Sequence, residues 1–115
     1  MTWYPVIGLE VHIQLQVLSK LFSKSATTYG AKPNSQASFI DLGLPGTLPI
    51  LNKETITQAI RFGFACDAKV SNEIKFDRKN YFYPDLPKGY QITQHYTPIL
   101  WGGHIDINTK DNKQK

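Results

Sequence analysis

The segment Val6-Ile-Gly-Leu-Glu-Val-His-Ile-Gln-Leu-Gln-Val17 alternates apolar and polar side chains. One face carries the apolar residues Ile7, Leu9, Val11, Ile13, Leu15 and Val17, and the other carries Val6, Gly8, Glu10, His12, Gln14 and Gln16. A period of two residues over this length is typical of a β-strand. We therefore predict a long strand whose apolar face covers a core.

A helix is predicted further along the chain, from about Lys53 to Cys66. Asn52 is a suitable N-cap, and Glu54 lies in the first turn, where the helix dipole favours an anion. Apolar and small residues then recur at helical spacing, at Ile56, Ala59, Ile60, Gly63 and Phe64.

Strand patterns return after this helix. The candidate strands are residues 74–83, 89–94 and 104–107, separated by turn residues. One main helix among several antiparallel strands predicts an α+β fold, and 115 residues fit a single domain.

Composition narrows the class of protein. No stretch approaches the roughly 18 apolar residues of a membrane helix, and the first residues lack the basic start of a secretory signal. Cys66 is the single cysteine, so no disulfide can form within the chain, and we expect a cytoplasmic protein without a membrane partner. A net charge of +4 permits an RNA partner without requiring one.

Glu10 and His12 are the first candidate functional pair. Residues two apart on a strand point to the same side, so this carboxylate and imidazole can share a hard cation such as Mg²⁺ or orient each other for proton transfer. An ordinary solvated strand face is the alternative. The absence of lysine from that face favours the lining of a polar cavity.

The second candidate is the run from Phe76 to Gln91, which mixes aromatic rings with cations. The aromatic residues are Phe76, Tyr81, Phe82, Tyr83 and Tyr90, and the cations are Arg78, Lys79 and Lys88. Such a mixture suits nucleotide bases and phosphates. An aromatic core strand with a rigid turn, its cations paired with Asp77 and Asp85, is an equally weighted alternative.

Both motifs resemble the N-terminal signatures of one family, the B subunits of bacterial-type glutamyl/aspartyl-tRNA amidotransferases. The matching stretches are residues 6–12 and 76–94, with Gly30-Ala-Lys-Pro-Asn34 and Leu42-Gly-Leu-Pro-Gly-Thr-Leu-Pro49 between them. The resemblance covers about residues 3–107 and implies a cradle-shaped α+β domain. Residues 1–115 would form its N-terminal part, about the first quarter of such a protein, without the family's later helical and tRNA-binding domains.

The resemblance also implies an activity. The family's enzyme uses ATP and glutamine to convert glutamyl-tRNA(Gln) or aspartyl-tRNA(Asn) into the amide form through an acyl phosphate. The B subunit binds the mischarged tRNA and phosphorylates the carboxylate of its amino acid. The A subunit, an amidase, releases ammonia from glutamine, and the C subunit joins the other two.

The family assigns roles to the two motifs. By match of motif, Glu10 and His12 look like ligands of the catalytic Mg²⁺. The residues that look like a polar substrate-binding or ammonia-conducting lining are Arg78, Lys79, Tyr81, Tyr83, Asp85 and Lys88. Among these, Lys79 and Lys88 are catalytic candidates because an ammonium group can steady developing negative charge.

One family feature is missing. Many relatives carry a pair of cysteines suited to zinc where this chain has Ser38 and Asp41, so we expect no zinc. A non-catalytic RNA-binding or assembly module and an inactive truncated product remain alternatives. We expect these 115 residues alone to be inactive, weakly stable and self-associating, because Mg²⁺ needs further ligands and a sheet edge stays open.

Overall fold

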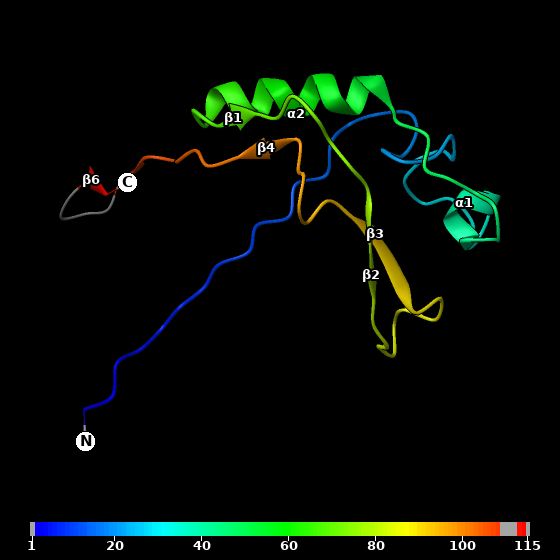
Figure 1. Cartoon of the computed structure of the whole chain (residues 1–115), viewed down its shortest axis with the longest axis horizontal. Helices are drawn as coiled ribbons and strands as arrows, with labels where there is room; N and C mark the ends of the chain where they lie inside the picture. Colours follow the sequence, from blue (N-terminus) through cyan, green and yellow to red (C-terminus); the bar gives the residue numbers. More distant parts are fainter. Residues whose placement is uncertain (1, 109–112, 115) are drawn as a thin grey trace.

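The structure, a computed structural model, describes residues 2–108 and 113–114. These residues contain two helices and six short strands. The helices are α1 (Phe39–Leu42) and α2 (Lys53–Ala65). The strands are β1 (Lys69–Val70), β2 (Asp77–Asn80), β3 (Tyr90–Thr93), β4 (Leu100–Trp101), β5 (Ile107–Asn108) and β6 (Lys113–Gln114). They pair as antiparallel couples, β1 with β4, β2 with β3 and β5 with β6, which confirms the α+β prediction (Figure 1).

Helix α2 forms where the sequence predicts it. The side chain of Asn52 accepts hydrogen bonds from the backbone N–H groups of Glu54 and Thr55, at 2.9 and 3.4 Å, and so caps the first turn. At the other end, a side chain on Gly63 would place its Cβ 2.5 Å from Leu100 Cδ2. The missing side chain therefore lets α2 pack closely against β4.

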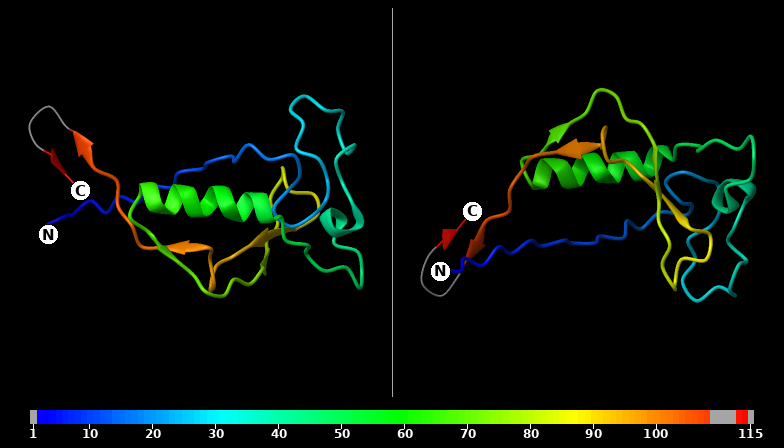
Figure 2. Two further views of the ribbon diagram at one scale, coloured as in Figure 1. Left: turned by 90° about the horizontal axis from the view of Figure 1, so that it is seen from above. Right: turned by 60° about the horizontal axis from the view of Figure 1, so that its bottom comes forward.

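Strands β2 and β3 form a hairpin within the predicted segments 74–83 and 89–94. Arg78 pairs with Ile92, and Asn80 pairs with Tyr90. Residues 81–89 close the hairpin, with the N–H of Tyr81 donating to the carbonyl of Gly89 at 3.0 Å. The hairpin projects away from α2, with α1 on one side (Figures 1 and 2).

The predicted strand at residues 6–17 is not formed. This segment belongs to no β-ladder, and its apolar face is largely open to solvent: Leu9 is 90% and Val11 81% exposed, whereas Leu15 and Val17 are half-buried. A strand needs a neighbour to accept and donate its backbone hydrogen bonds, and the described residues offer none here. Figure 1 shows the segment leading away from α2 and the hairpin.

The chain is open rather than closed around a core. Its radius of gyration is 17.7 Å, whereas a compact domain of this length has roughly 13 Å. Among the described residues, Tyr90 is the one buried large apolar side chain, at 4% exposure. The predicted strand at 104–107 overlaps β5 only at Ile107, and sequence pattern does not predict the short elements α1, β1, β4 and β6. Because β6 pairs with β5, the expectation that this strand finds no partner within the chain is wrong.

Within the described residues, no helix has the length and apolar character that crossing a membrane requires.

Candidate functional site

The register of the hairpin separates two neighbouring cations. Arg78 pairs with Ile92, and Ile92 and Tyr90 are two residues apart on β3, so Arg78 and Tyr90 lie on the same face of the hairpin. Lys79, the next residue along β2, lies on the opposite face. The guanidinium carbon of Arg78 is 3.9 Å from the centroid of the Tyr90 ring. The ammonium of Lys79 is instead 4.9 Å from the ring of Tyr81. Each cation is thus held over an aromatic face.

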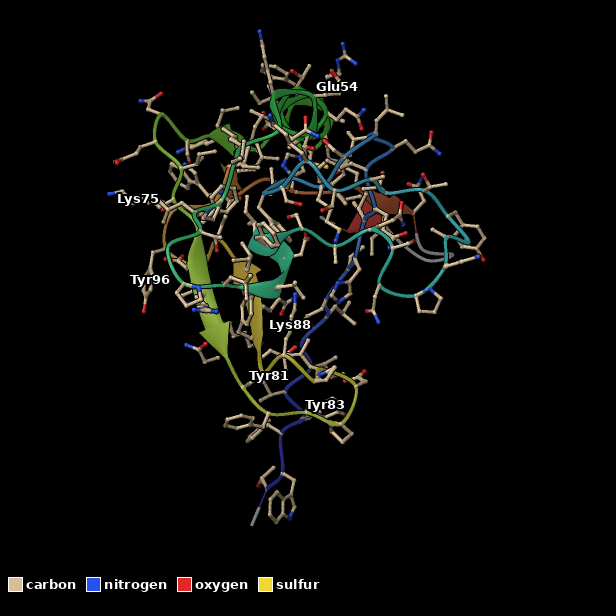
Figure 3. The ribbon with its side chains drawn as sticks, turned by 90° about the vertical axis from the view of Figure 1, so that its right-hand side faces the viewer. Glu54, Lys75, Tyr81, Tyr83, Lys88 and Tyr96 are labelled. Carbon is tan, nitrogen blue, oxygen red and sulfur yellow. The ribbon has the colours of Figure 1, made fainter. Side chains whose placement is uncertain are left out.

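Lys88 joins the Tyr90 face from the tip of the hairpin. Its ammonium lies 4.9 Å from the centroid of the Tyr90 ring and 3.5 Å from the backbone carbonyl oxygen of Asp41 in α1. Figure 3 shows Lys88, Tyr81 and Tyr83 gathered at this end of the molecule. The structure therefore brings Arg78 and Lys88 to one buried ring.

Neither nearby carboxylate, Asp77 or Asp85, forms an ion pair with these cations in the described part of the chain. Asp77 accepts hydrogen bonds from the backbone N–H groups of His95 and Tyr96, at 2.8 and 3.1 Å. Asp85 is exposed, and none of the hairpin's three cations is in an ion pair within the described part of the chain. The part of the alternative that pairs Asp77 and Asp85 with the cations is therefore wrong, whereas Tyr90 is buried, as that alternative expects. Positive charge without an internal partner favours an anionic ligand.

A hollow of about 410 Å³ lies beside this face. Its lining includes Arg78 and Tyr90 from the hairpin and residues 43–47 from the loop after α1. Gly43 has a φ of 66°, and a Cβ there would meet the Tyr90 hydroxyl at 2.6 Å and Arg78 Nη2 at 2.7 Å. Glycine at this position therefore allows the loop to approach the hairpin closely.

The remaining hairpin candidates are accessible. Tyr83 is 63% exposed, Tyr81 is partly buried, and Asp85 lies in the exposed connection between the strands. Figure 3 shows Tyr81 and Tyr83 near Lys88, and neither these tyrosines nor Asp85 is among the residues that line the hollow beside Tyr90.

Glu10 and His12 do point to the same side of the chain, as predicted. Glu10 Oε2 and His12 Nε2 are 3.9 Å apart, so one ion could contact both. The two side chains are 92% and 90% exposed, so the predicted polar concavity around them is wrong for the described residues. Their extended segment also runs apart from the hairpin in two views (Figures 1 and 2).

The pair fits part of a Mg²⁺ site. A carboxylate oxygen and an imidazole nitrogen are suitable donors, but Mg²⁺ takes six ligands in near-octahedral geometry. Among the described residues, no group of three or more His, Cys, Asp or Glu side chains is arranged to hold a metal. Glu10 and His12 could therefore supply only a fraction of the shell.

Asp41 joins segments that lie far apart in the sequence, through contacts that no sequence pattern above predicts. Its side chain is 6% exposed and accepts hydrogen bonds from Lys20 Nζ at 2.7 Å and Ser25 Oγ at 2.5 Å. Ser23 Oγ and the N–H and Oγ of Ser38 donate to the same carboxylate, at 3.1, 2.8 and 2.7 Å. The Ser-x-x-Asp spacing of residues 38–41 is a capping-box pattern, the one local signal that could have indicated it.

The surroundings of Asp41 shift its pKa. Burial raises the pKa of this carboxyl, but the ammonium of Lys20 and the hydroxyls of Ser25 and Ser38 lower it more strongly. The net result is a pKa well below the ordinary range of aspartate. The carboxylate therefore stabilises the folded arrangement while it stays charged.

We expect the protection of α1 against amide hydrogen exchange to depend on this charge. The folded pKa lies below the unfolded value of about 3.9, so the stabilisation is complete above that value and is lost as pH falls below it. Asp41→Asn should lower the local opening free energy at the Ser38 and Gly43 amides by about 1.5 kcal/mol at pH 7 and flatten its decline below pH 4. The exposed Asp67→Asn is the control and should change neither quantity.

The chain is similar to known proteins along its whole length. Residues 5–115 match the sequence model of a family described as the GatB/GatE catalytic domain. A protein of Francisella tularensis subsp. novicida, named as the B subunit of aspartyl/glutamyl-tRNA(Asn/Gln) amidotransferase, is 64% identical over 109 residues, which is 95% of this chain and 23% of that protein.

Two further relatives carry the same name. The protein of Pseudomonas savastanoi pv. phaseolicola is 57% identical, and that of Azotobacter vinelandii is 58% identical, each over 115 residues. These alignments cover 100% of this chain and 24% of each relative. The chain thus spans about a quarter of the length of the curated relatives that it matches.

Proposed function

Because the chain belongs to the GatB/GatE catalytic domain family, we propose that it forms part of an ATP- and glutamine-dependent amidotransferase that acts on mischarged tRNA. The observation that carries the proposal is the family match over residues 5–115, together with identities of 57–64% to subunits named for this reaction. The substrates would be glutamyl-tRNA(Gln) or aspartyl-tRNA(Asn).

The chemistry requires activation of a carboxylate. Ammonia does not displace oxide from a carboxylate, so one oxygen first accepts the γ-phosphoryl group of ATP, which gives ADP and an acyl phosphate. Ammonia then attacks the carbonyl carbon, inorganic phosphate leaves, and the nitrogen loses a proton to give the amide. Both steps place extra negative charge near the reacting carbon and phosphorus.

Glu10 and His12 would hold the Mg²⁺ that accompanies ATP, in a shell completed by other groups. The ion would neutralise charge on the phosphates. The support for this role is the 3.9 Å separation of the two donor atoms on one side of an extended segment. Their exposure leaves both side chains accessible to a nucleotide.

The hairpin would receive the negative groups of the substrates. These phosphate and carboxylate groups would be bound by the cations Arg78, Lys79 and Lys88. The support for this role is that none of the three cations has an ion-pair partner within the described residues. Tyr81, Tyr83 and Asp85 would line the path by which ammonia reaches the acyl phosphate.

The proposed partners are the two other subunits of the enzyme. The amidase, or A, subunit would supply ammonia from glutamine, and the C subunit would join that amidase to this protein in the cytoplasm. Zinc would have no part, since the side chains of Ser38 and Asp41 bond to each other and the Asp41 carboxylate also bonds to Lys20.

The proposal is tested by comparing the 115-residue chain alone with a full-length protein, meaning a B subunit of the relatives' length that begins with these 115 residues. With the A and C subunits, ATP, glutamine and labelled glutamyl-tRNA(Gln), the full-length protein should form glutaminyl-tRNA. The 115 residues in its place should form none, because Glu10 and His12 offer only two of six Mg²⁺ ligands. No amide from the full-length protein would refute the proposed function, and amide from the short chain would refute the incomplete metal site.

A further inference from the structure

We propose that Asp41 is a positioning residue for Lys88, which it acts on by fixing helix α1 against the β2–β3 hairpin. The side chain and the backbone carbonyl of Asp41 contact different parts of the chain. The carboxylate of Asp41 ties α1 to the segment 20–25, and its backbone carbonyl contacts the ammonium of Lys88. The proposal rests on the proposed function only where amide formation is measured.

The Asp41 carboxylate accepts hydrogen bonds from three side chains of the segment 20–25. Lys20 Nζ lies 2.7 Å from Oδ1, while Ser23 Oγ and Ser25 Oγ lie 3.1 and 2.5 Å from Oδ2. Lys20 also donates to the carbonyl of Gln36 at 2.8 Å. These contacts join the segment 20–25 to α1, and the burial of Asp41 and Ser23, at 6% and 2% exposure, makes the loss of their hydrogen bonds costly.

The carbonyl end reaches the hairpin. The hydroxyl of Tyr90 donates to the carbonyl oxygen of Asp41 at 2.9 Å and lies 3.3 Å from that of Ile40. Lys88 Nζ lies 3.5 Å from the same Asp41 oxygen and 4.9 Å from the Tyr90 ring. Lys88 is exposed and its flexible stem has many rotamers, so these two contacts are what favours one direction of its ammonium.

Polar contacts, rather than apolar packing, decide where α1 lies. The helix is a single turn, too short to be stable by itself. Two of its apolar side chains, Phe39 and Leu42, are 70% and 57% exposed. If the Asp41 carboxylate lost its charge, α1 would lose its main anchor, and the carbonyl group that meets Lys88 would move with it.

The reactivity of the Lys88 amine tests the positioning directly. The full-length protein is treated with a limiting amine-acylating reagent, and acylation of each lysine is quantified by mass spectrometry. Asp41→Asn should raise the acylation rate of Lys88 severalfold and leave unchanged that of Lys75, whose ammonium pairs with exposed Glu73 at 3.0 Å.

Tyr90→Phe is the second variant, because it keeps the ring under Lys88 but removes the hydroxyl that contacts α1. It should raise acylation of Lys88 as Asp41→Asn does. An unchanged Lys88 rate in a variant whose far-ultraviolet circular dichroism matches the wild type would overturn the proposal.

A double-mutant cycle tests whether the effect passes through Lys88. In the complete enzyme, Asp41→Asn should lower kcat about tenfold, the loss expected for one charge-assisted contact. In a Lys88→Ala background the same change should have almost no further effect, because its target is gone. Additive losses would overturn the proposal. Wild-type amide formation by Lys88→Ala, with acylation still raised by Asp41→Asn, would refute the catalytic role of Lys88 instead.

Discussion

Glu10→Gln in the complete enzyme is expected to lower the rate of amide formation about 10²–10³-fold. Glutamine keeps the size of the side chain but removes the charge that attracts Mg²⁺. His12→Ala should also lower this rate, because His12 Nε2 lies 3.9 Å from Glu10 Oε2 and would contact the same ion. The measurement is the initial rate of conversion of glutamyl-tRNA(Gln) at a series of Mg²⁺ concentrations.

The dependence on Mg²⁺ separates a lost ligand from a damaged fold. Raising the Mg²⁺ concentration should restore part of the activity of Glu10→Gln, because weakened binding is overcome by mass action. Glu54→Gln is the matched control, an exposed glutamate on α2 that contacts Gln58 at 3.2 Å. A Glu10→Gln enzyme with full activity at every Mg²⁺ concentration would contradict the metal role.

Lys88→Ala is expected to cost about 2–4 kcal/mol of transition-state stabilisation if its ammonium meets developing charge. Lys79→Ala should act in the same direction from the other face of the hairpin, where its ammonium lies over Tyr81. The loss should fall on kcat/KM for amide formation. Overall stability should change far less, because neither side chain is in an ion pair within the described residues.

Lys75→Ala provides the comparison for both lysines. Lys75 stands at the far end of the hairpin from Lys88 (Figure 3), and its pairing with Glu73 is solvent-exposed. Its removal should leave amide formation near the wild-type rate. Equal rates for Lys75→Ala, Lys79→Ala and Lys88→Ala would make the aromatic and basic run a structural feature without a catalytic role.

Elements with local signals were predictable from the sequence. Helix α2 has its N-cap, Asn52, and its helical spacing within one short stretch, and it ends one residue before the predicted boundary at Cys66. Strands β2 and β3 lie within their predicted segments because each segment carries a strand pattern bounded by turn residues. The same alternation rule placed Glu10 and His12 on one side.

Features that depend on distant partners were not predictable. Residues 6–17 have the alternation of a strand, but alternation describes side chains and does not supply the neighbour that completes the backbone hydrogen bonds. The contacts of Asp41 were not predictable for a related reason. Lys20 and Asp41 are 21 residues apart in sequence, so no spacing rule joins them.

The most direct measurement of the central claim is the consumption of ATP by the complete enzyme in the absence of glutamine and ammonia. If this protein activates the amino acid on its tRNA, ADP should form with glutamyl-tRNA(Gln) but not with uncharged tRNA, and the Glu10→Gln enzyme should form it far more slowly. ADP formation that is indifferent to the attached amino acid, or amide formation without ATP, would contradict the account.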